Sequence, residues 1–326
     1  MLYPLTFQPI FKDRVWGGRE LERLYGKRLP AGASVGESWE VSDRPGDASV
    51  IAHGPLAGKN LRWLMENHAP ELLGTAKPAA DGRFPLLCKI LDAREKLSLQ
   101  VHPPASKAKA LDGEPKTELW FIADAAPDAA LYVGLKRGAT RAEFEERIAN
   151  GCVEDCFHRI PVKPGDTMFL PSGRVHAIGA GLVIFEIQQN SDTTYRVFDW
   201  NRTGLDGKPR ELHVAKSLAS IDFNDFEPQL VPANYRQGPN FKFRELVECP
   251  LFTVQEMVFE NAGSVSPAGQ FLRILAVVKG AATVVAGGAQ APIELKPGDF
   301  CLIPACLKNV EVKAQAQTTF LCAEPN

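Results

Sequence analysis

Apolar residues occur along this chain in many short runs, each about the length of a β-strand. Four of the runs read FPLLCKIL (84–91), LWFIA (119–123), GLVIFEIQQ (181–189) and LRILAVVKG (272–280). Glycine (27 residues) and proline (25 residues) are spread between the runs and favour turns there. Many short strands joined by turns are typical of a sandwich or barrel, so we expect a mainly β fold.

Three segments have helical patterns instead. In 60–68, Asn60 precedes apolar residues at 61, 64 and 65 and is a suitable N-cap. In 140–150, Thr140 and Glu143 have the spacing of a capping box, and a glycine follows the segment. The third candidate is 211–220. We interpret the first two helices as insertions at the edge of a β core.

A weak internal repeat divides the chain. The segments KPGDTMFLPSGRVH (163–176) and KPGDFCLIPACLKN (296–309) share KPGD, an apolar strand and a proline at the same interval. The repeat indicates two copies of one β unit. We place the first domain at 1–230 and the second at 231–326, with a linker rich in proline and asparagine over 224–240.

Polar residues at strand positions of the first unit could bind a metal ion. Period-2 geometry places Ser98, Gln100 and His102 on one face of a strand. Lys116 and Glu118 share a face of the next apolar run. His176 follows a tight turn in the repeat segment. Two histidines, one glutamate and one amide oxygen would satisfy zinc and leave room for a substrate oxygen or water.

The second unit has no comparable set of donors. Cys306 stands where the first copy has Gly173, and Asn309 stands where it has His176. No histidine follows His213 anywhere in the sequence. We therefore expect the second unit to bind no metal and to cover the first.

The run 181–189 has two different faces. Val183, Phe185 and Ile187 alternate with Ile184, Glu186 and Gln188. The face that carries Glu186 either lines a pocket or meets solvent, and the alternation alone is compatible with both.

The composition of the chain mainly excludes certain classes of function and structure. Lysine and arginine number 37 and aspartate and glutamate 39, so the formal net charge of -2 offers no basic excess for nucleic acid. No run approaches the ~18 apolar residues of a membrane span. The seven cysteines are odd in number and irregularly spaced, which argues against a disulfide framework and favours a reducing, cytoplasmic location.

Several motifs together resemble one enzyme family. The run from Gly165 to His176 reads G-x5-P-x-G-x2-H and resembles the second motif of the cupin barrel. Gln100-Val101-His102-Pro103 departs from the usual cupin pair of histidines but resembles the Q-x-H-P of phosphomannose isomerases. Further matches are a K-x-E (116–118), an E-x4-S-D-x3-R (186–196), VWGG (15–18) and GESWEVSDRPG (36–46). The chain is thus similar to the short bacterial type I mannose-6-phosphate isomerases, with specific motifs over residues 1–220.

This resemblance implies a fold, an activity and a site. It implies two cupin-type (jelly-roll) β-barrels with a few helical insertions. It also implies interconversion of mannose 6-phosphate and fructose 6-phosphate through an enediol. The metal, one Zn²⁺ per chain, would be bound by Gln100, His102, Glu118 and His176.

By the same resemblance, the remaining site residues surround the sugar phosphate. Arg196 would be the cation beside the reacting carbons, and Ser98 and Lys116 would contact the substrate. Asp192 and Glu186 are candidates for the proton-transfer shell, together with Lys116, and the identity of the base stays open.

Two other functions remain to be weighed at this stage. An iron-dependent cupin dioxygenase would need similar ligands but not Lys116 and Arg196 for an anionic sugar. A non-catalytic sugar-phosphate-binding relative would be expected to lack one of the metal-ligand residues or Arg196, whereas this sequence has all four ligand residues and Arg196.

Overall fold

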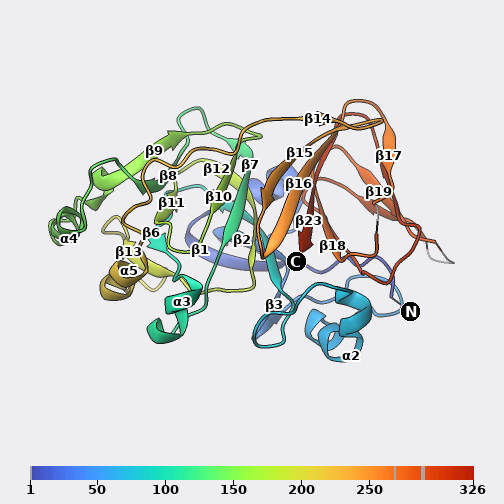
Figure 1. Ribbon diagram of the computed structural model, residues 1–326, viewed down its shortest axis with the longest axis horizontal. Coiled ribbons are helices and arrows are strands. Elements are labelled where there is room, and N and C mark those ends of the chain that lie inside the picture. The colour runs from blue at the N-terminus through green and yellow to red at the C-terminus, as the bar shows by residue number, and fades with distance from the viewer. Residues whose placement is uncertain (1, 268, 288–290) are drawn as a thin grey trace.

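The computed structural model describes residues 2–267, 269–287 and 291–326, and strands dominate it (Figure 1). The first half of the chain holds a six-stranded antiparallel sheet and a five-stranded antiparallel sheet. In sheet order, the first contains β1 (Ile10–Gly18), β2 (Val35–Val41), β5 (Leu86–Ala93), β12 (Leu182–Gln189), β7 (Glu118–Ala125) and β10 (Thr167–Leu170). The second contains β13 (Tyr195–Phe198), β6 (Leu99–Val101), β11 (His176–Ile178), β8 (Ala130–Leu135) and β9 (Phe157–Pro161).

The second half of the chain repeats this arrangement. Its six-stranded sheet contains β14 (Arg236–Gln237), β15 (Lys242–Glu248), β16 (Phe252–Phe259), β23 (Thr318–Pro325), β18 (Arg273–Lys279) and β21 (Phe300–Ile303) in that order. Its four-stranded sheet contains β17 (Gly263–Val265), β22 (Glu311–Ala314), β19 (Ala282–Val285) and β20 (Ile293–Leu295). A two-stranded ribbon, β3 (Asp43–Arg44) and β4 (Asp47–Ala48), completes the strands. The mainly β fold expected from the sequence is confirmed.

The KPGD repeat is confirmed as a repeated turn. In each copy the aspartate side chain accepts a hydrogen bond from the backbone N–H three residues earlier, at 2.9 Å for Asp166 and 3.0 Å for Asp299. Gly165 and Gly298 have φ of 89° and 84°, a conformation that only glycine adopts without steric cost. The turns lead into β10 and β21, which hold the same place at the edge of the two six-stranded sheets.

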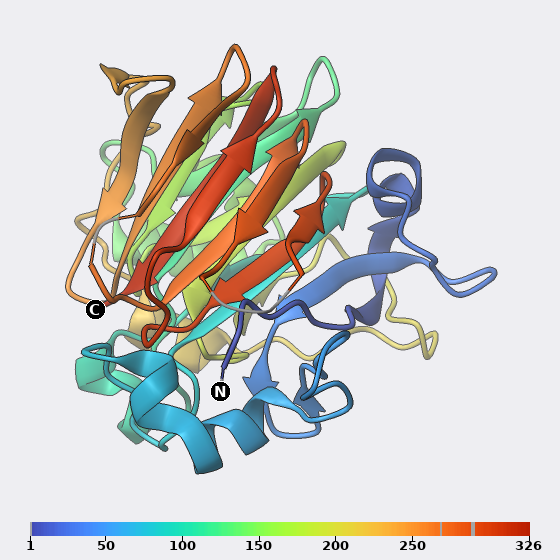
Figure 2. The ribbon, with the colours of Figure 1, turned by 90° about the vertical axis from the view of Figure 1, so that its right-hand side faces the viewer.

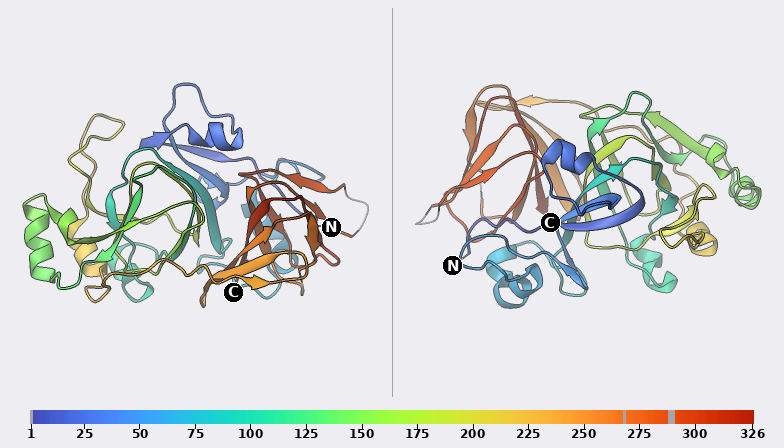
Figure 3. Two further views of the ribbon diagram at one scale, coloured as in Figure 1. Left: turned by 90° about the horizontal axis from the view of Figure 1, so that it is seen from above. Right: turned by 180° about the vertical axis from the view of Figure 1, so that it is seen from behind.

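The two six-stranded sheets pack face to face through apolar side chains. On β12, Val183 and Phe185 belong to this shared core, whereas Ile184 lies in the core between the two sheets of the first half. The ring of Phe185 stacks on that of Phe300, with centroids 5.6 Å apart and planes 16° apart. Figure 3 shows the two halves side by side. Because the central strands β5, β12 and β18 are buried on both faces, they are nearly continuous apolar runs.

A cation from each half also reaches the KPGD turn of the other half. Arg244 of the second half is paired with the buried Glu256 and donates a hydrogen bond to the carbonyl of Gly165 at 2.5 Å. Lys27 of the first half, itself paired with a buried glutamate, donates to the carbonyl of Gly298 at 3.2 Å. These two contacts join the halves in addition to the shared core.

Helices are few and short. They are α1 (Glu20–Tyr25), α2 (Leu61–Leu73), α3 (Ala105–Ala108), α4 (Arg141–Ala149), α5 (Val214–Ser220) and the 3₁₀ turns η1 (Lys109–Leu111) and η2 (Val153–Cys156). Helices α4 and α5 lie at the outer end of the first half, away from the second (Figure 1). Among the described residues, no helix has the length and apolar composition needed to cross a bilayer.

The expected helix starts are confirmed at two positions. The side chain of Asn60 accepts the N–H of Trp63, and that of Thr140 accepts the N–H of Glu143. Helix α2 extends five residues past the expected end at residue 68, across a non-helical His68. Helix α5 begins at residue 214 instead of 211, because residues 211 and 213 form hydrogen bonds with Arg196 of β13.

The amino-terminal segment and α2 belong spatially to both halves. Leu5 bridges to Leu302 of β21, and the backbone N–H of Ala305 donates to the carbonyl of Leu72 at the end of α2. Figure 2 shows α2 at the lower end of the second-half sheet. The segment 224–240 is mostly irregular, as expected of a linker. The boundary near residue 230 stays a prediction.

Candidate active site and metal centre

Three of the expected metal ligands converge between the two sheets of the first half. His102 follows β6 and His176 opens β11 on one sheet, whereas Glu118 opens β7 on the other. One ligand atom from each lies within 4.8 Å of the others, and all three residues are buried. Within the part of the chain that the structure describes, this is the one such cluster of histidine, cysteine, aspartate or glutamate.

Backbone carbonyls orient both imidazoles. Nδ1 of His102 lies 2.7 Å from the carbonyl oxygen of Thr193, and Nδ1 of His176 lies 2.9 Å from that of Arg174. Each Nδ1 therefore carries the proton and donates it, which leaves the Nε2 lone pair directed toward Glu118. Burial lowers the pKa of His102 to about 4 and also lowers that of His176. Both rings are thus neutral near pH 7, the form that binds metals.

The charge of Glu118 is only partly compensated by the protein. Oε1 of Glu118 and Nε2 of His102 have no hydrogen-bond partner, and Oε2 of Glu118 has only the Lys116 ammonium as its ion-pair partner. Burial by itself would raise the pKa of Glu118, but the Lys116 ammonium at 2.7 Å outweighs it and holds that pKa well below its usual range. Buried polar atoms without partners are costly. A divalent cation among these side chains would satisfy all of these atoms at once, so the residues fit a metal.

Cross-strand register brings Gln100 and Arg196 beside this cluster. Gln100 pairs with His176 on one side and with Arg196 on the other, and opposed residues share a face of the sheet. The side-chain nitrogen of Gln100 lies 3.3 Å from Nε2 of His176. A half-turn of the amide presents its oxygen at the same point, as a metal ligand requires.

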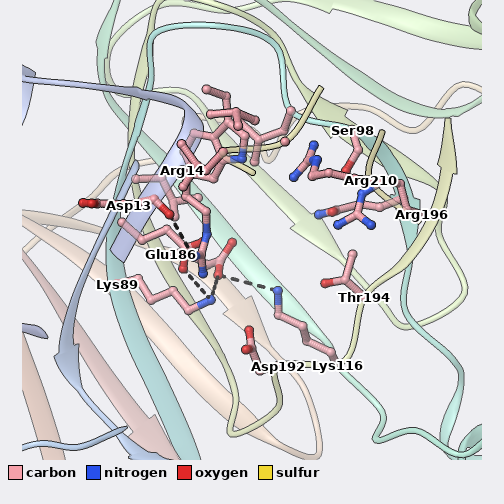
Figure 4. Close-up of a pocket in the computed structure, with 18 of the residues that line it drawn as sticks. Asp13, Arg14, Lys89, Ser98, Lys116, Glu186, Asp192, Thr194, Arg196 and Arg210 are labelled. Atoms are coloured by element: carbon pink, nitrogen blue, oxygen red, sulfur yellow. Dashed lines mark hydrogen bonds and ion pairs between the residues drawn. The ribbon is translucent and has the colours of Figure 1, made fainter. Parts of the chain in front are cut away.

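A pocket of about 570 Å³ opens next to the cluster (Figure 4). Its lining includes every remaining residue that the sequence singled out, namely Ser98, Gln100, Lys116, Glu186, Asp192 and Arg196. Figure 4 shows Lys116 extending toward Glu186, with Asp192 close by, and Ser98, Thr194 and Arg196 on another side. The face of β12 that carries Glu186 therefore lines a pocket and does not meet solvent.

The charged residues of the pocket that sequence reasoning missed include Glu37 and Lys89 on strands, and Asp206 and Arg210 outside them. Nζ of Lys89 lies 3.5 Å from Glu37 and 3.4 Å from Glu186, and Glu186 lies 3.7 Å from Lys116. Burial raises the pKa of Glu37, but Lys89 and Arg14 outweigh it and lower that pKa to about 2. Lys89 is the one charge in the apolar run LLCKIL, a sequence signal that could have found it, whereas Glu37 shares its strand with Glu40 and has no such signal.

Two tryptophans complete this row of alternating charges. The indole N–H of Trp39 donates to Glu37 at 2.6 Å, and that of Trp120 donates to Glu186 at 2.8 Å. Both rings are buried, so they hold the carboxylates in place while excluding water.

The second half carries a cation where the first carries the carboxylate of Glu118. Leu170 of β10 pairs with Glu118, and the corresponding Ile303 of β21 pairs with Arg273. Arg273 forms an ion pair with Glu324 at 2.6 Å. A guanidinium at this position disfavours a metal ion, in line with the expectation that the second half binds none, which stays a prediction.

Comparisons with known proteins agree with this geometry. The family model for "Phosphomannose isomerase type I, catalytic domain" matches residues 5–119. The mannose-6-phosphate isomerase ManA of Bacillus subtilis is 36% identical over 316 residues, which cover 96% of this chain and 97% of the relative. That of Streptococcus mutans is 34% identical over 95% of each chain.

A solved structure extends the likeness to the whole fold. The crystal structure of the mannose 6-phosphate isomerase from Bacillus subtilis matches with a TM-score of 0.89 at 31% identity, over 99% of each chain. None of these likenesses favours an oxygenase. Because similarity in sequence and fold covers nearly the whole chain, this protein belongs to the type I phosphomannose isomerase family.

Proposed function

We propose that this protein interconverts mannose 6-phosphate and fructose 6-phosphate with the help of one bound divalent metal. The observation that carries the proposal is the buried set of His102, Glu118 and His176, whose unpartnered atoms lie beside a pocket edged by cations. Such a site suits a substrate that has neighbouring oxygens to be polarised and a phosphate to be neutralised. The relatives from Bacillus subtilis and Streptococcus mutans are mannose-6-phosphate isomerases.

We assign the metal as zinc, held by Gln100, His102, Glu118 and His176. Two neutral imidazoles, one carboxylate and one amide oxygen match the preferences of this borderline cation. When bound, zinc polarises the sugar oxygens and stabilises the negative charge of an enediol. The carbonyl partners of both Nδ1 atoms keep the imidazoles in the tautomer that this role requires.

The other residues of the pocket act on the substrate. Isomerisation moves a proton between C2 and C1 while negative charge builds on oxygen. Arg196, one strand away from Gln100, offers a permanently charged fork to that oxygen. Ser98 and Lys116 would bind the sugar phosphate and fix the reacting carbons.

We assign the proton transfer to the group formed by Lys116, Glu186 and Asp192. Glu186 is held by Trp120 and by two ammonium groups, so its position is fixed. Asp192 is exposed and lines the pocket, where it can reach a bound sugar. Transfer on one face of the sugar needs acid and base on the same side, and Figure 4 shows these three residues together.

The test is a coupled assay that converts mannose 6-phosphate to fructose 6-phosphate. We expect turnover by the purified protein, its loss after chelation and its recovery with zinc. The double variant His102→Ala/His176→Ala should contain no metal by elemental analysis and show no turnover. Unchanged metal content in the double variant would refute the ligand assignment, and oxygen consumption with bound iron would favour a dioxygenase.

The seven cysteines are all free, in keeping with the cytoplasmic location that we propose.

A further inference from the structure

Two arginines, Arg202 and Arg210, share a single buried carboxylate, Asp199. Nε of Arg202 donates to Asp199 at 3.0 Å, and Arg210 donates to both carboxylate oxygens, at 2.5 and 2.6 Å. Burial, and next the charge of Arg210, lower the pKa of Arg196, which identifies these guanidiniums as close neighbours. Of these side chains Arg196 and Arg210 line the pocket, and Asp199 offsets only one of the three positive charges of Arg196, Arg202 and Arg210.

The same carboxylate anchors a hairpin over the pocket. Thr203 and Pro209 form a bridge at its base, and its tip carries Leu205, which is 67% exposed. Residues 204–206 line the pocket. Arg202 stands at the start of this hairpin and Arg210 at its end, so Asp199 holds both legs at once.

We propose that Asp199 is a positioning residue for substrate binding, which acts by fixing Arg210 at the pocket wall. Asp199 is 5% exposed and does not line the pocket, whereas Arg210 does. A bidentate contact orients the guanidinium before a ligand arrives, so an anionic group of the substrate meets a preformed partner. Without the carboxylate, Arg210 would regain rotamer freedom and be repelled by Arg196 and Arg202.

This inference rests on the proposed function, and a double-mutant cycle tests it. The variants are Asp199→Asn, Arg210→Gln and their combination, all in the full-length zinc-loaded protein. The control Glu211→Gln removes one negative charge from the same segment, but from a side chain that is 83% exposed. The readouts are KM and kcat for mannose 6-phosphate, with zinc content and melting temperature measured on the same samples.

We expect Asp199→Asn and Arg210→Gln each to raise KM on the order of 10-fold or more, with kcat changed by less than about 3-fold. The double variant should be no worse than Arg210→Gln, since the two residues act as a unit. Glu211→Gln should leave KM near that of the wild type. Partial unfolding of a variant lowers kcat but leaves KM unchanged, so a purely structural role gives the opposite pattern.

Two results would overturn the proposal. The first is a normal KM in Asp199→Asn, whatever its melting temperature. The second is a double variant in which the two effects add. If the wild type itself does not turn over mannose 6-phosphate, the proposed function fails. The same double-mutant cycle is then measured by binding, through the rise in melting temperature that mannose 6-phosphate causes in each variant.

Discussion

Replacing Lys116 by methionine would separate its electrostatic role from metal binding. Nζ of Lys116 lies 2.7 Å from Glu118 and 3.7 Å from Glu186, and both carboxylates are buried. After the substitution Glu186 keeps Lys89 and Trp120, whereas Glu118 loses its ammonium partner. The change keeps the shape of the side chain and removes its charge.

The magnitude follows from this distance. At an effective dielectric constant of about 20, unit charges 2.7 Å apart attract by about 6 kcal/mol. Removing the ammonium also removes its own desolvation cost, so breaking a buried pair costs about 3–5 kcal/mol. We therefore expect Lys116→Met, measured after chelation, to lower the free energy of unfolding by that amount.

Zinc would restore the missing positive charge beside Glu118. The zinc-loaded variant should therefore lose less stability than the chelated variant, and it should bind zinc more tightly than the wild type. Recovery of about 1.4–3 kcal/mol corresponds to a zinc Kd lowered about 10- to 150-fold. Urea unfolding with and without zinc, together with competition against a chelator of known affinity, measures both quantities.

Lys89→Met is the matched control. Nζ of Lys89 is paired with Glu37 and Glu186 instead of Glu118, so the cost of its removal should not depend on zinc. An equal loss of stability in Lys116→Met with and without zinc, or a weaker affinity for zinc, would refute this account of the site.

Four further outcomes are expected. Arg196→Ala and Arg196→Lys should each lower turnover on the order of 10²–10³-fold, with metal content and melting temperature unchanged. Near-normal turnover in both variants would mean that Arg196 does not lie beside the reacting carbons. Elemental analysis should give one zinc per chain. A second zinc bound in the second half would contradict the interpretation that the Arg273 guanidinium disfavours a metal ion there. Burial raises the pKa of Asp92 to about 6, so its contribution to stability is present below pH ~4 and is lost as pH rises to about 6. Asp92→Asn should flatten that decline in urea unfolding, and an unchanged pH profile would exclude Asp92 as its source. Phe185→Ala should lower the free energy of unfolding by about 3–5 kcal/mol, and a loss below 1 kcal/mol would mean that the stacked Phe300 collapses into the space.

Local patterns predicted the elements whose signals are contained in a few residues. Asn60 and Thr140 cap their helices through neighbours three positions away, and both contacts are present. The start of α5 was predicted three residues too early, because the carbonyl of Glu211 accepts a hydrogen bond from the Arg196 side chain. That contact comes from a distant strand, and no local pattern encodes it.

The site shows the same limit more strongly. Strand patterns suggested candidate metal ligands, but their assignment as one set rested on family resemblance, since His102, Glu118 and His176 are separated by long stretches of chain and meet only where the two sheets of the first half face each other. Alternation on β12 left two environments open for Glu186, and only its position between β5 and β7 decides between them. Asp199 gave no signal, because its partners lie in an irregular hairpin.

The strand order of the two six-stranded sheets has a consequence for how the chain folds. In each sheet the strand that joins the two sides is the last to be synthesised: β12 inserts between β5 and β7, and β23 inserts between β16 and β18. The apolar outer face of the first sheet therefore has no cover on a growing chain until residues 318–325 have left the ribosome. Such non-local pairing is slow and leaves apolar surface exposed to aggregation. Efficient production of this enzyme should therefore depend on chaperones that protect the first half while the second is being made.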